Sequence, residues 1–246
     1  MSIEGKVAVV TGAARGLGRA ICERLAEDGV LIAAWDLNLE GAEETAALIR
    51  EQGGTAIACG GDASSAADIA AALEQTRSEL GRVSILVNNA GLSPFCKFEE
   101  LTEEAFDNLI AINLKGPFLC CKAMVPDMVE DGWGRVINIS SSSAQTGAKS
   151  MAHYVASKGG VIGLTKALAL EYATAGITFN NVPPNFVDTP GLRNAPVDVD
   201  AFAQSTPMKR TGKPRNIAAA VAFLASEDAD YITGHTLGVN GGRYSN

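Results

Sequence analysis

The chain has 246 residues and a mass of 25.5 kDa, and its 47% hydrophobic residues can bury the core of one α/β domain over residues 1–246. The formal net charge of −8 comes without any basic stripe, which argues against nucleic acid or an anionic membrane as a partner. We expect a cytoplasmic protein with reduced thiols, because the N-terminus does not read as a signal peptide, no apolar run reaches the ~18–20 residues of a membrane span, and the five cysteines form no C-x-x-C pair.

Only two histidines occur, His153 and His235. A multi-histidine metal site is therefore excluded, and cysteine-rich zinc spacing is absent, so we expect no metal. His153 precedes Tyr154, and on a helix it points about 100° away from that side chain. We interpret His153 as a surface or cleft-rim residue, with substrate contact as the alternative.

Short apolar runs alternate with segments of helical spacing along the chain. We expect strands at residues 6–10, 30–35, 55–59, 84–87, 135–139, 177–181 and 235–239. We expect helices at 16–28, 40–52, 66–80, 103–130 (interrupted near Gly116 and Pro117), 152–175 and 216–225. This alternation predicts right-handed crossovers and a doubly wound parallel sheet with helices on both faces.

A glycine-rich turn, T-G-A-A-R-G-L-G at residues 11–18, joins the first strand to the first helix. Its glycines permit a tight turn and a close approach of backbone to phosphate. The N-terminus of the following helix offers free N–H groups to a pyrophosphate. This position between strand and helix predicts a dinucleotide site rather than a plain structural turn.

Asp36 ends the second strand, where a carboxylate can bind an adenosine ribose and repel a 2′-phosphate. It therefore favours NAD over NADP, although Arg15 in the turn could pair with a 2′-phosphate. Asp36 could instead cap the turn before Asn38. Asp62, after the third strand, is a candidate contact for adenine or a cap of its own loop.

The run N-N-A-G at residues 88–91 closes the fourth strand with small side chains, which suit a backbone packed against the cofactor or a turn that braces the sheet. Further along, Tyr154 and Lys158 are four residues apart and share one helix face. A nearby ammonium favours phenolate and lowers a tyrosine pKa, which makes the pair a proton donor and acceptor for alcohol/ketone interconversion. Ser141, thirteen residues before Tyr154, supplies a second hydroxyl.

These motifs together resemble the short-chain dehydrogenase/reductase family over the whole chain, with Asn113 in N-L-K-G and Y-V-A-S-K at 154–158 as further matches. The resemblance implies a Rossmann-like sheet of seven strands, a nicotinamide cofactor and a homotetramer. It implies that Tyr154 is the acid/base and that Ser141 holds the substrate oxygen. It also implies that Lys158 binds the nicotinamide ribose and lowers the tyrosine pKa, and that Asn113 positions a water in a proton relay.

The predicted site residues fall into two groups besides the catalytic four. Cofactor contacts are predicted for Gly12, Arg15, Gly16, Leu17, Gly18, Asp36, Leu37, Asp62, Ala63, Asn89, Ala90, Gly91, Tyr154, Lys158, Pro184, Val187 and Thr189. Substrate contacts are predicted for Ser93, Phe95, Ser143, Gln145, Asn185 and Phe186.

Two departures from the family pattern occur. Asn185 stands where the family usually has glycine, and Asn240 stands where it commonly has aspartate. Asparagine tolerates a positive φ, so the turn at Asn185 is expected to survive. The segment 183–212 is long for a connection, and we interpret 189–210 as a substrate lid, with a rigid packed loop as the alternative.

The resulting hypothesis is an NAD-dependent oxidoreductase that interconverts a small secondary alcohol and a ketone. The first alternative is an NADPH-dependent reductase of carbonyls or 3-oxoacyl thioesters, which Arg15 supports and Asp36 opposes. The second is a catalytically silent binding subunit of the same fold, which the presence of Ser141, Tyr154 and Lys158 disfavours.

Overall fold

Strands and helices alternate through the computed structural model, which describes residues 3–193 and 198–244. The strands are β1 (Val7–Thr11), β2 (Leu31–Asp36), β3 (Ala56–Gly60), β4 (Val83–Asn88), β5 (Gly134–Ile139) and β6 (Ile177–Val182). The longer helices are α1 (Gly16–Glu27), α2 (Leu39–Glu51), α3 (Ala66–Glu79), α4 (Glu103–Ile110), α5 (Gly116–Asp131), α7 (Ala152–Glu171) and α10 (Pro214–Ala225). The shorter ones are η1 (Phe98–Glu100), η2 (Ala111–Lys115), α6 (Ser143–Thr146), α8 (Pro190–Arg193), α9 (Val199–Ser205) and η3 (Glu227–Ala229).

All six strands form one parallel sheet in the order β3-β2-β1-β4-β5-β6. The strand order reverses between β1 and β4, which is the topological switch point where ligands bind in doubly wound folds. The carboxyl ends of the strands share one edge of the sheet, so the residues that follow β1, β2, β4, β5 and β6 meet there.

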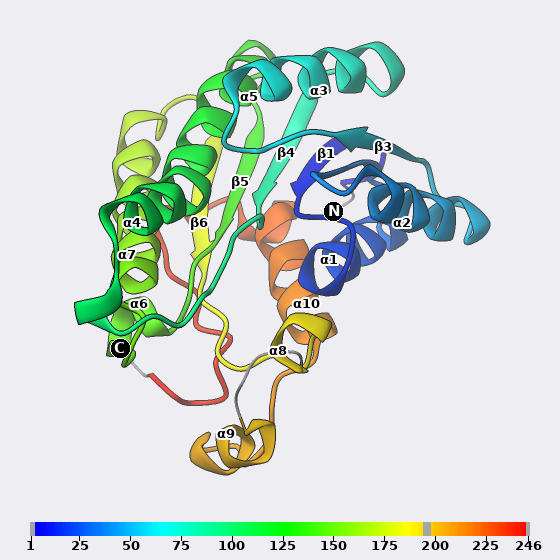
Figure 1. Cartoon of the computed structure of the whole chain (residues 1–246). Coiled ribbons are helices and arrows are strands. Elements are labelled where there is room, and N and C mark those ends of the chain that lie inside the picture. Colours follow the sequence, from blue (N-terminus) through cyan, green and yellow to red (C-terminus); the bar gives the residue numbers. More distant parts are fainter. Residues whose placement is uncertain (1–2, 194–197, 245–246) are drawn as a thin grey trace.

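Helices lie on both faces of the sheet (Figure 1). Side chains that alternate along each strand separate the core into two layers. Along β1, Ala8 and Val10 face one layer, together with Ile21 of α1 and Val221 of α10. Val9 between them faces the other layer, whose helices are α3, α5 and α7. Helices on both faces of a parallel sheet confirm the predicted doubly wound α/β fold.

The seventh expected strand, at 235–239, is not formed as a strand in the described residues. Thr236 and Val239 make isolated parallel bridges to Asn181 and Pro184 alongside β6. Backbone bonds flank the first bridge, from the Asn181 amide to the His235 oxygen at 2.9 Å and from the Leu237 amide to the Asn181 oxygen at 2.8 Å. They do not extend into a ladder, because the His235 amide donates to Asn180 Oδ1 at 3.1 Å and Pro183 has no amide hydrogen. The edge strand is therefore reduced to bridges, which corrects the expected count of seven strands to six.

The long helix expected at 103–130 is divided. Its break comes earlier than Gly116, because the five residues of η2 form a π-helix between α4 and α5. The segment expected to be irregular, 183–212, contains α8 and α9. Part of the expected lid, residues 194–197, lies outside the described residues.

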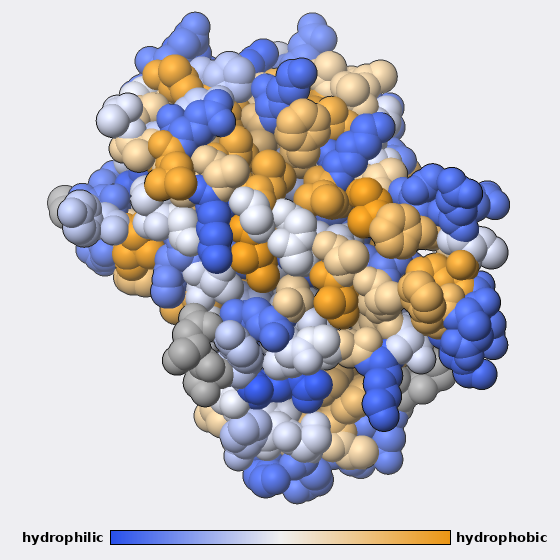
Figure 2. All heavy atoms as spheres, turned by 90° about the vertical axis from the view of Figure 1, so that its left-hand side faces the viewer, coloured by the Kyte–Doolittle hydropathy of each residue, from blue (hydrophilic) through white to orange (hydrophobic). Residues whose placement is uncertain are grey.

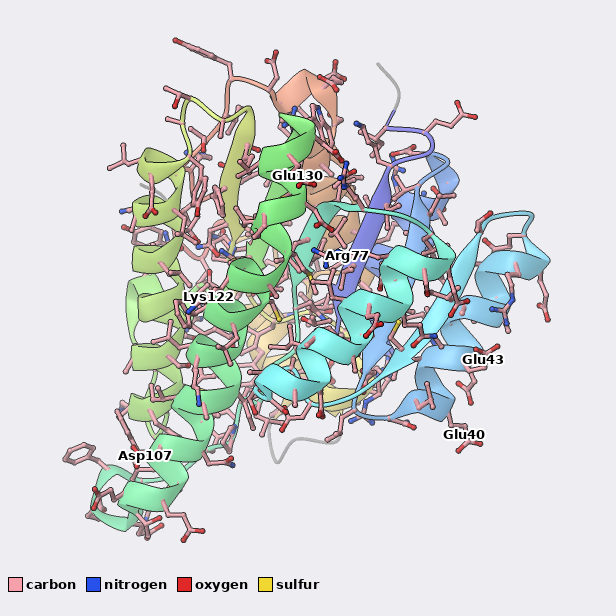
Figure 3. All side chains as sticks on the ribbon, turned by 90° about the horizontal axis from the view of Figure 1, so that it is seen from above. Glu40, Glu43, Arg77, Asp107, Lys122 and Glu130 are labelled. Carbon is pink, nitrogen blue, oxygen red and sulfur yellow. The ribbon has the colours of Figure 1, made fainter. Side chains whose placement is uncertain are left out.

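One helical run, Glu103–Asp131, is long and apolar enough to cross a membrane by length and composition alone, which differs from the expectation of no such run. Its inner side belongs to the core, where Met124 and Met128 are fully buried. Asp127 also binds it to its neighbours, accepting from Arg77 Nε of α3 at 3.0 Å and from the Val83 amide of β4 at 3.1 Å. Figure 3 shows Arg77 extending from α3 toward α5.

Candidate active site

The glycine-rich turn after β1 is built for close backbone contacts. Gly12 and Gly16 have φ values of +69° and +61°. A Cβ on Gly18 would lie 2.0 Å from the Gly12 carbonyl oxygen, so only glycine fits there. α1 starts at Gly16 without a side-chain cap, whereas α2, α3, α4 and α9 each have one. The first-turn N–H groups of α1 therefore point, uncapped, to the switch point, which fits a pyrophosphate.

Thr11 and Asn89 brace this turn against the end of β4. Thr11 Oγ1 accepts from the amides of Asn89 and Ala90, each at 3.0 Å. Asn89 Nδ2 donates to the carbonyl oxygens of Thr11 at 2.9 Å and Gly12 at 3.1 Å. The N-N-A-G run thus acts as a structural brace at the predicted cofactor edge.

Asp36 lies at the end of β2, and its carboxylate is bound to two backbone amides. Oδ2 accepts from Ala14 and Oδ1 accepts from Asn38, each at 2.9 Å. The carboxylate thereby stabilises the glycine-rich turn, as the capping alternative predicted, and its remaining lone pairs can still accept from a ribose. Arg15 is exposed beside it.

The other predicted cofactor contacts line the same edge. Asp62 Oδ1 accepts from both the amide and the hydroxyl of Ser64 at 2.8 Å, which makes it a cap of its own loop. Thr189 approaches the glycine-rich turn, since a Cβ on Gly16 would lie 3.7 Å from its Cβ. Leu17, Ala63, Pro184 and Val187 are buried or half-buried near these turns, and Leu37 is exposed.

Asn113 lies in the π-helix η2 and is fully buried. Its side chain accepts from the Leu92 amide and donates to the Leu92 carbonyl oxygen, both at 2.9 Å. A Cβ on Gly91 would lie 3.0 Å from Asn113 Oδ1 and 3.2 Å from Lys158 Nζ. The structure therefore brings three separate motifs, N-N-A-G, N-L-K-G and Y-V-A-S-K, to one point.

Burial dominates the electrostatics of the two reactive side chains of α7. It raises the pKa of Tyr154, and a hydrogen bond with the Ser141 side chain acts in the opposite direction. It lowers the pKa of Lys158 to about 8, and Lys158 Nζ donates to the Ile139 carbonyl oxygen at 2.9 Å. The tyrosine pKa is therefore not lowered as expected, and the side chain that acts to lower it is Ser141.

His153 is not the surface residue that we expected from its place in the sequence. It is 1% exposed, and its Nδ1 has no hydrogen-bond partner. It belongs to the inward face of α7 with Ser157 and Lys158, one helical turn further on. The physical reason is that this face packs against η2, where Asn113 Nδ2 donates to Ser157 Oγ at 3.2 Å.

The predicted substrate residues divide into those beside the Ser141 turn and those elsewhere. Ser143 donates its amide to Ser141 Oγ at 3.1 Å, and Asn185 contacts Ser142. Gln145 instead lines a cavity of about 510 Å³ between α6, α7 and the C-terminal segment, together with Lys166, His235 and Tyr244. Ser93 and Phe95 are exposed on the segment that the Cys96 amide ties to the Ser150 carbonyl oxygen at 2.7 Å.

Three residues near this turn were not among the predicted site residues. Phe202 of α9 stacks on Phe186 with ring centroids 3.7 Å apart, and Thr206 bonds to Asn185. The Arg243 guanidinium lies over the Phe186 ring at 5.2 Å. Thr206 and Arg243 lie in irregular segments and Phe202 lies in the short helix α9, where no periodicity marks a buried position.

Metal chemistry and disulfides find no support in the part of the chain that the structure describes. No group of three or more histidine, cysteine or acidic residues there could hold a metal ion. All five cysteines are free, and burial raises the pKa of Cys121 to about 12.

A dinucleotide cradle at the switch point, beside a serine, a tyrosine and a lysine, defines an NAD(P)-dependent oxidoreductase that acts on CH–OH groups. Comparison with known proteins agrees with this class. Residues 12–243 match the family model described as enoyl-(acyl carrier protein) reductase. The chain belongs to the short-chain dehydrogenase/reductase family.

Curated relatives match over nearly the whole chain. It is 43% identical to nodulation protein G of Azospirillum brasilense, over 96% of this chain and 97% of that protein. It is 41% identical to the 3-oxoacyl-(acyl-carrier-protein) reductase FabG of Vibrio cholerae, over 99% of both chains. It is 37% identical to an uncharacterized oxidoreductase of Thermotoga maritima, over 98% of both.

Proposed function

We propose that this protein transfers a hydride between a nicotinamide cofactor and a small secondary alcohol or its ketone, with Tyr154 as the acid/base. The observation that carries the proposal is the contact of Ser141 with Tyr154, with Lys158 Nζ close to Asn113 at the end of β4. A bound nicotinamide would supply or accept the hydride. The chain must then position the substrate oxygen and exchange its proton.

Each catalytic side chain has one task in this proposal. Ser141 and Tyr154 donate hydrogen bonds to the oxygen on which negative charge develops during carbonyl reduction. Tyr154 gives its proton to that oxygen, or takes it back during alcohol oxidation. Lys158 holds the nicotinamide ribose and stabilises phenolate by its charge when protonated. Asn113 fixes the neighbouring backbone of Leu92 and orders a water for proton return.

NAD is the proposed cofactor, because Asp36 holds a carboxylate at the end of β2, bound to the Ala14 and Asn38 amides. A 2′-phosphate would meet like charge there. Arg15 is the opposing feature, since its exposed guanidinium could pair with a 2′-phosphate.

The cofactor proposal predicts the effect of Asp36→Ser. This variant is expected to raise kcat/KM with NADP relative to NAD, because the repulsion is relieved and Arg15 becomes free to pair. Steady-state kinetics of wild type and variant with both cofactors provide the measurement, and Glu51→Ser, which removes an exposed carboxylate at the C-terminal end of α2, is the control. A wild-type protein that prefers NADP would contradict the proposal.

Reduction of a 3-oxoacyl thioester is the second candidate, favoured by the FabG relatives of Vibrio cholerae and of Salmonella typhimurium, the latter 40% identical. Substrate assays separate the two. Cyclic and aryl secondary alcohols with NAD are compared with 3-oxoacyl thioesters and NADPH. Turnover of the thioester alone would replace the leading substrate class, and binding of cofactor without turnover of either class would favour a silent binding subunit.

The remaining partner expectations belong to the same proposal. We propose a cytoplasmic homotetramer whose only other ligand is the small-molecule substrate, without nucleic acid or membrane. The net charge of −8 supports this set of partners.

A further inference from the structure

Asn185 replaces the glycine that is usual in the family, and the backbone does not explain the choice. Among the described non-glycine residues, only Ser150 and Lys209 have positive φ values. Asn185 therefore occupies an ordinary region that any residue adopts, contrary to the expectation that its tolerance of positive φ preserves the turn. What Asn185 adds to the site is its side chain.

The carboxamide of Asn185 is part of a directed chain of hydrogen bonds. Thr206 Oγ1 donates to the Phe202 carbonyl oxygen at 3.1 Å, so its proton is used and it accepts from Asn185 Nδ2 at 3.3 Å. Asn185 Oδ1 then accepts from Ser142 Oγ at 3.4 Å. The one hydroxyl proton of Thr206 thus fixes the orientation of the amide.

One end of this chain lies in the turn that carries the catalytic serine. Ser142 stands between Ser141 and Ser143 and is 1% exposed. Its amide donates to the Pro184 carbonyl oxygen at 2.9 Å, while the Ser143 amide donates to Ser141 Oγ at 3.1 Å. A displacement of Ser142 therefore moves the backbone that orients the Ser141 hydroxyl.

The other end lies at the end of α9. Thr206 is 2% exposed although the helix before it has no buried residue. Phe186, next to Asn185, stacks on Phe202 at 3.7 Å and 10° between ring planes. Two neighbouring residues after β6 therefore hold α9, one by a hydrogen bond and one by ring stacking.

We propose that Asn185 is a positioning residue that couples the placement of α9 to the orientation of Ser141. The proposal rests on the function proposed above, in which Ser141 binds the substrate oxygen. The bond from Asn185 Nδ2 is 3.3 Å long and the bond to Asn185 Oδ1 is 3.4 Å long. Usual lengths are about 2.7–3.2 Å for N–H···O and about 2.5–3.0 Å for O–H···O, so both bonds can shorten as α9 moves toward the turn. Substrate held beneath α9 thereby stabilises the catalytic geometry of Ser141.

Two substitutions remove the hydrogen bond between Asn185 and Thr206, one from each side. Asn185→Ala removes the carboxamide at a backbone conformation that alanine accepts, and Thr206→Val removes the acceptor while keeping the side-chain shape. Thr206→Ser retains the hydroxyl and serves as the rescue. Ser205→Ala is the matched control, because Ser205 Oγ also donates to the Phe202 carbonyl oxygen, at 2.9 Å, without touching Asn185.

Steady-state kinetics distinguish a residue that orients Ser141 from one that only holds α9 against the substrate. Loss of one hydrogen bond changes a rate or equilibrium constant by a factor of about 3 to 10. Asn185→Ala and Thr206→Val are each expected to lower kcat by that factor with KM nearly unchanged, because the lost orientation acts in the transition state. The double variant should lose no more than either single one. A raised KM with unchanged kcat, or additive losses, would overturn the proposal, since α9 would then only bind substrate.

Hydrogen exchange tests the coupling without turnover. In both variants exchange is expected to rise in residues 199–206 and also in 140–146, while Thr206→Ser and Ser205→Ala match wild type. A rise confined to 199–206 would refute the coupling. If wild type turned over no alcohol or ketone, the proposed function would fail, yet these exchange data would still decide whether α9 and the Ser141 turn are linked.

Discussion

Tyr154 and Lys158 are two reactive side chains on one turn of α7, and burial shifts the pKa of both. Burial disfavours phenolate on Tyr154 and ammonium on Lys158, so it raises the pKa of the tyrosine and lowers the pKa of the lysine to about 8. The Ser141 contact is the one local feature that favours phenolate. Catalysis at these residues therefore depends on hydrogen bonds to the substrate oxygen as much as on charge.

Tyr154→Phe is expected to abolish turnover and leave cofactor affinity nearly intact, because the ring still packs and only the hydroxyl is lost. General acid/base catalysis is typically worth ~10²–10⁴-fold, which sets the size of the loss. Turnover assays with fluorescence titration of the reduced cofactor provide the measurement. Near-normal activity would remove Tyr154 from the acid/base role.

The lowered pKa of Lys158 predicts that the stability of the folded protein depends on pH. The unfolded chain holds this proton up to about pH 10.5 and the folded chain releases it near 8, so the unfolded state binds more protons between these values. The free energy of unfolding of wild type relative to Lys158→Met should therefore rise with pH in this interval, by on the order of 3 kcal/mol at most. Urea unfolding of both proteins from pH 7 to 10 tests it, and a difference that stays constant would contradict the lowered pKa.

At the scale of elements, the sequence predicts strands and crossover helices well because buried parallel strands are continuous apolar runs. The first six strands fall within a residue or two of their expected positions. The failure at 235–239 has a local cause, because the Asn180 and Thr233 side chains bond to backbone groups that a ladder would use. Side-chain competition of this kind leaves no trace in apolar periodicity.

The candidate site was predictable where it rests on motifs. Ser141, Tyr154 and Lys158 come from spacing, and their convergence follows from parallel strands that end at one edge. The burial of His153 and the outward cavity at Gln145 depend on how α7 rotates against η2 and α6, and sequence spacing does not set that rotation. Thr206 was missed because a loop residue has no partner pattern.

The segment 189–210 is expected to become more protected from hydrogen exchange when NAD binds. α8 should respond most, because it has no buried residue and its bonds are local, such as Arg193 Nε to Asp188 Oδ1 at 2.6 Å. Thr189 before it approaches Gly16 of the cofactor turn. Hydrogen exchange with and without NAD provides the measurement, with β3 residues as an internal control. Equal and strong protection in both states would identify a rigid loop instead of a lid.

At the scale of the molecule, large apolar side chains are exposed on both helical layers of the sheet. On the α4, α5 and α7 side, Phe106, Phe118 and Leu170 are 39%, 45% and 82% exposed. Figure 2 shows hydrophobic side chains in several clusters across the middle of the face on the left of Figure 1, with hydrophilic residues between them and around the rim. Gly163 of α7 offers open space where a Cβ would meet nothing, which permits close helix contact.

The charged side chains of α4 and α5 are of both signs, so they can face those of a second copy of the chain. Lys122 and Glu130 of α5 and Asp107 of α4 are exposed and carry both signs (Figure 3). A second apolar position, Phe223 of α10, is 42% exposed on the opposite layer of the sheet. A molecule with two different two-fold contacts needs two separate surfaces, and Phe223 supplies an exposed apolar side chain for the second one.

A homotetramer is therefore expected, with α4, α5 and α7 paired across one two-fold axis and α10 with residues 235–239 across another. Sedimentation velocity at micromolar concentration should give one tetrameric species. Leu170→Glu and Phe223→Glu should each yield dimers, because each places a charge in only one of the two contacts. Leu39→Glu is the matched control, since Leu39 is 52% exposed on α2, away from both faces. A monomeric wild-type protein, or loss of the tetramer in the Leu39 variant as well, would contradict the predicted assembly.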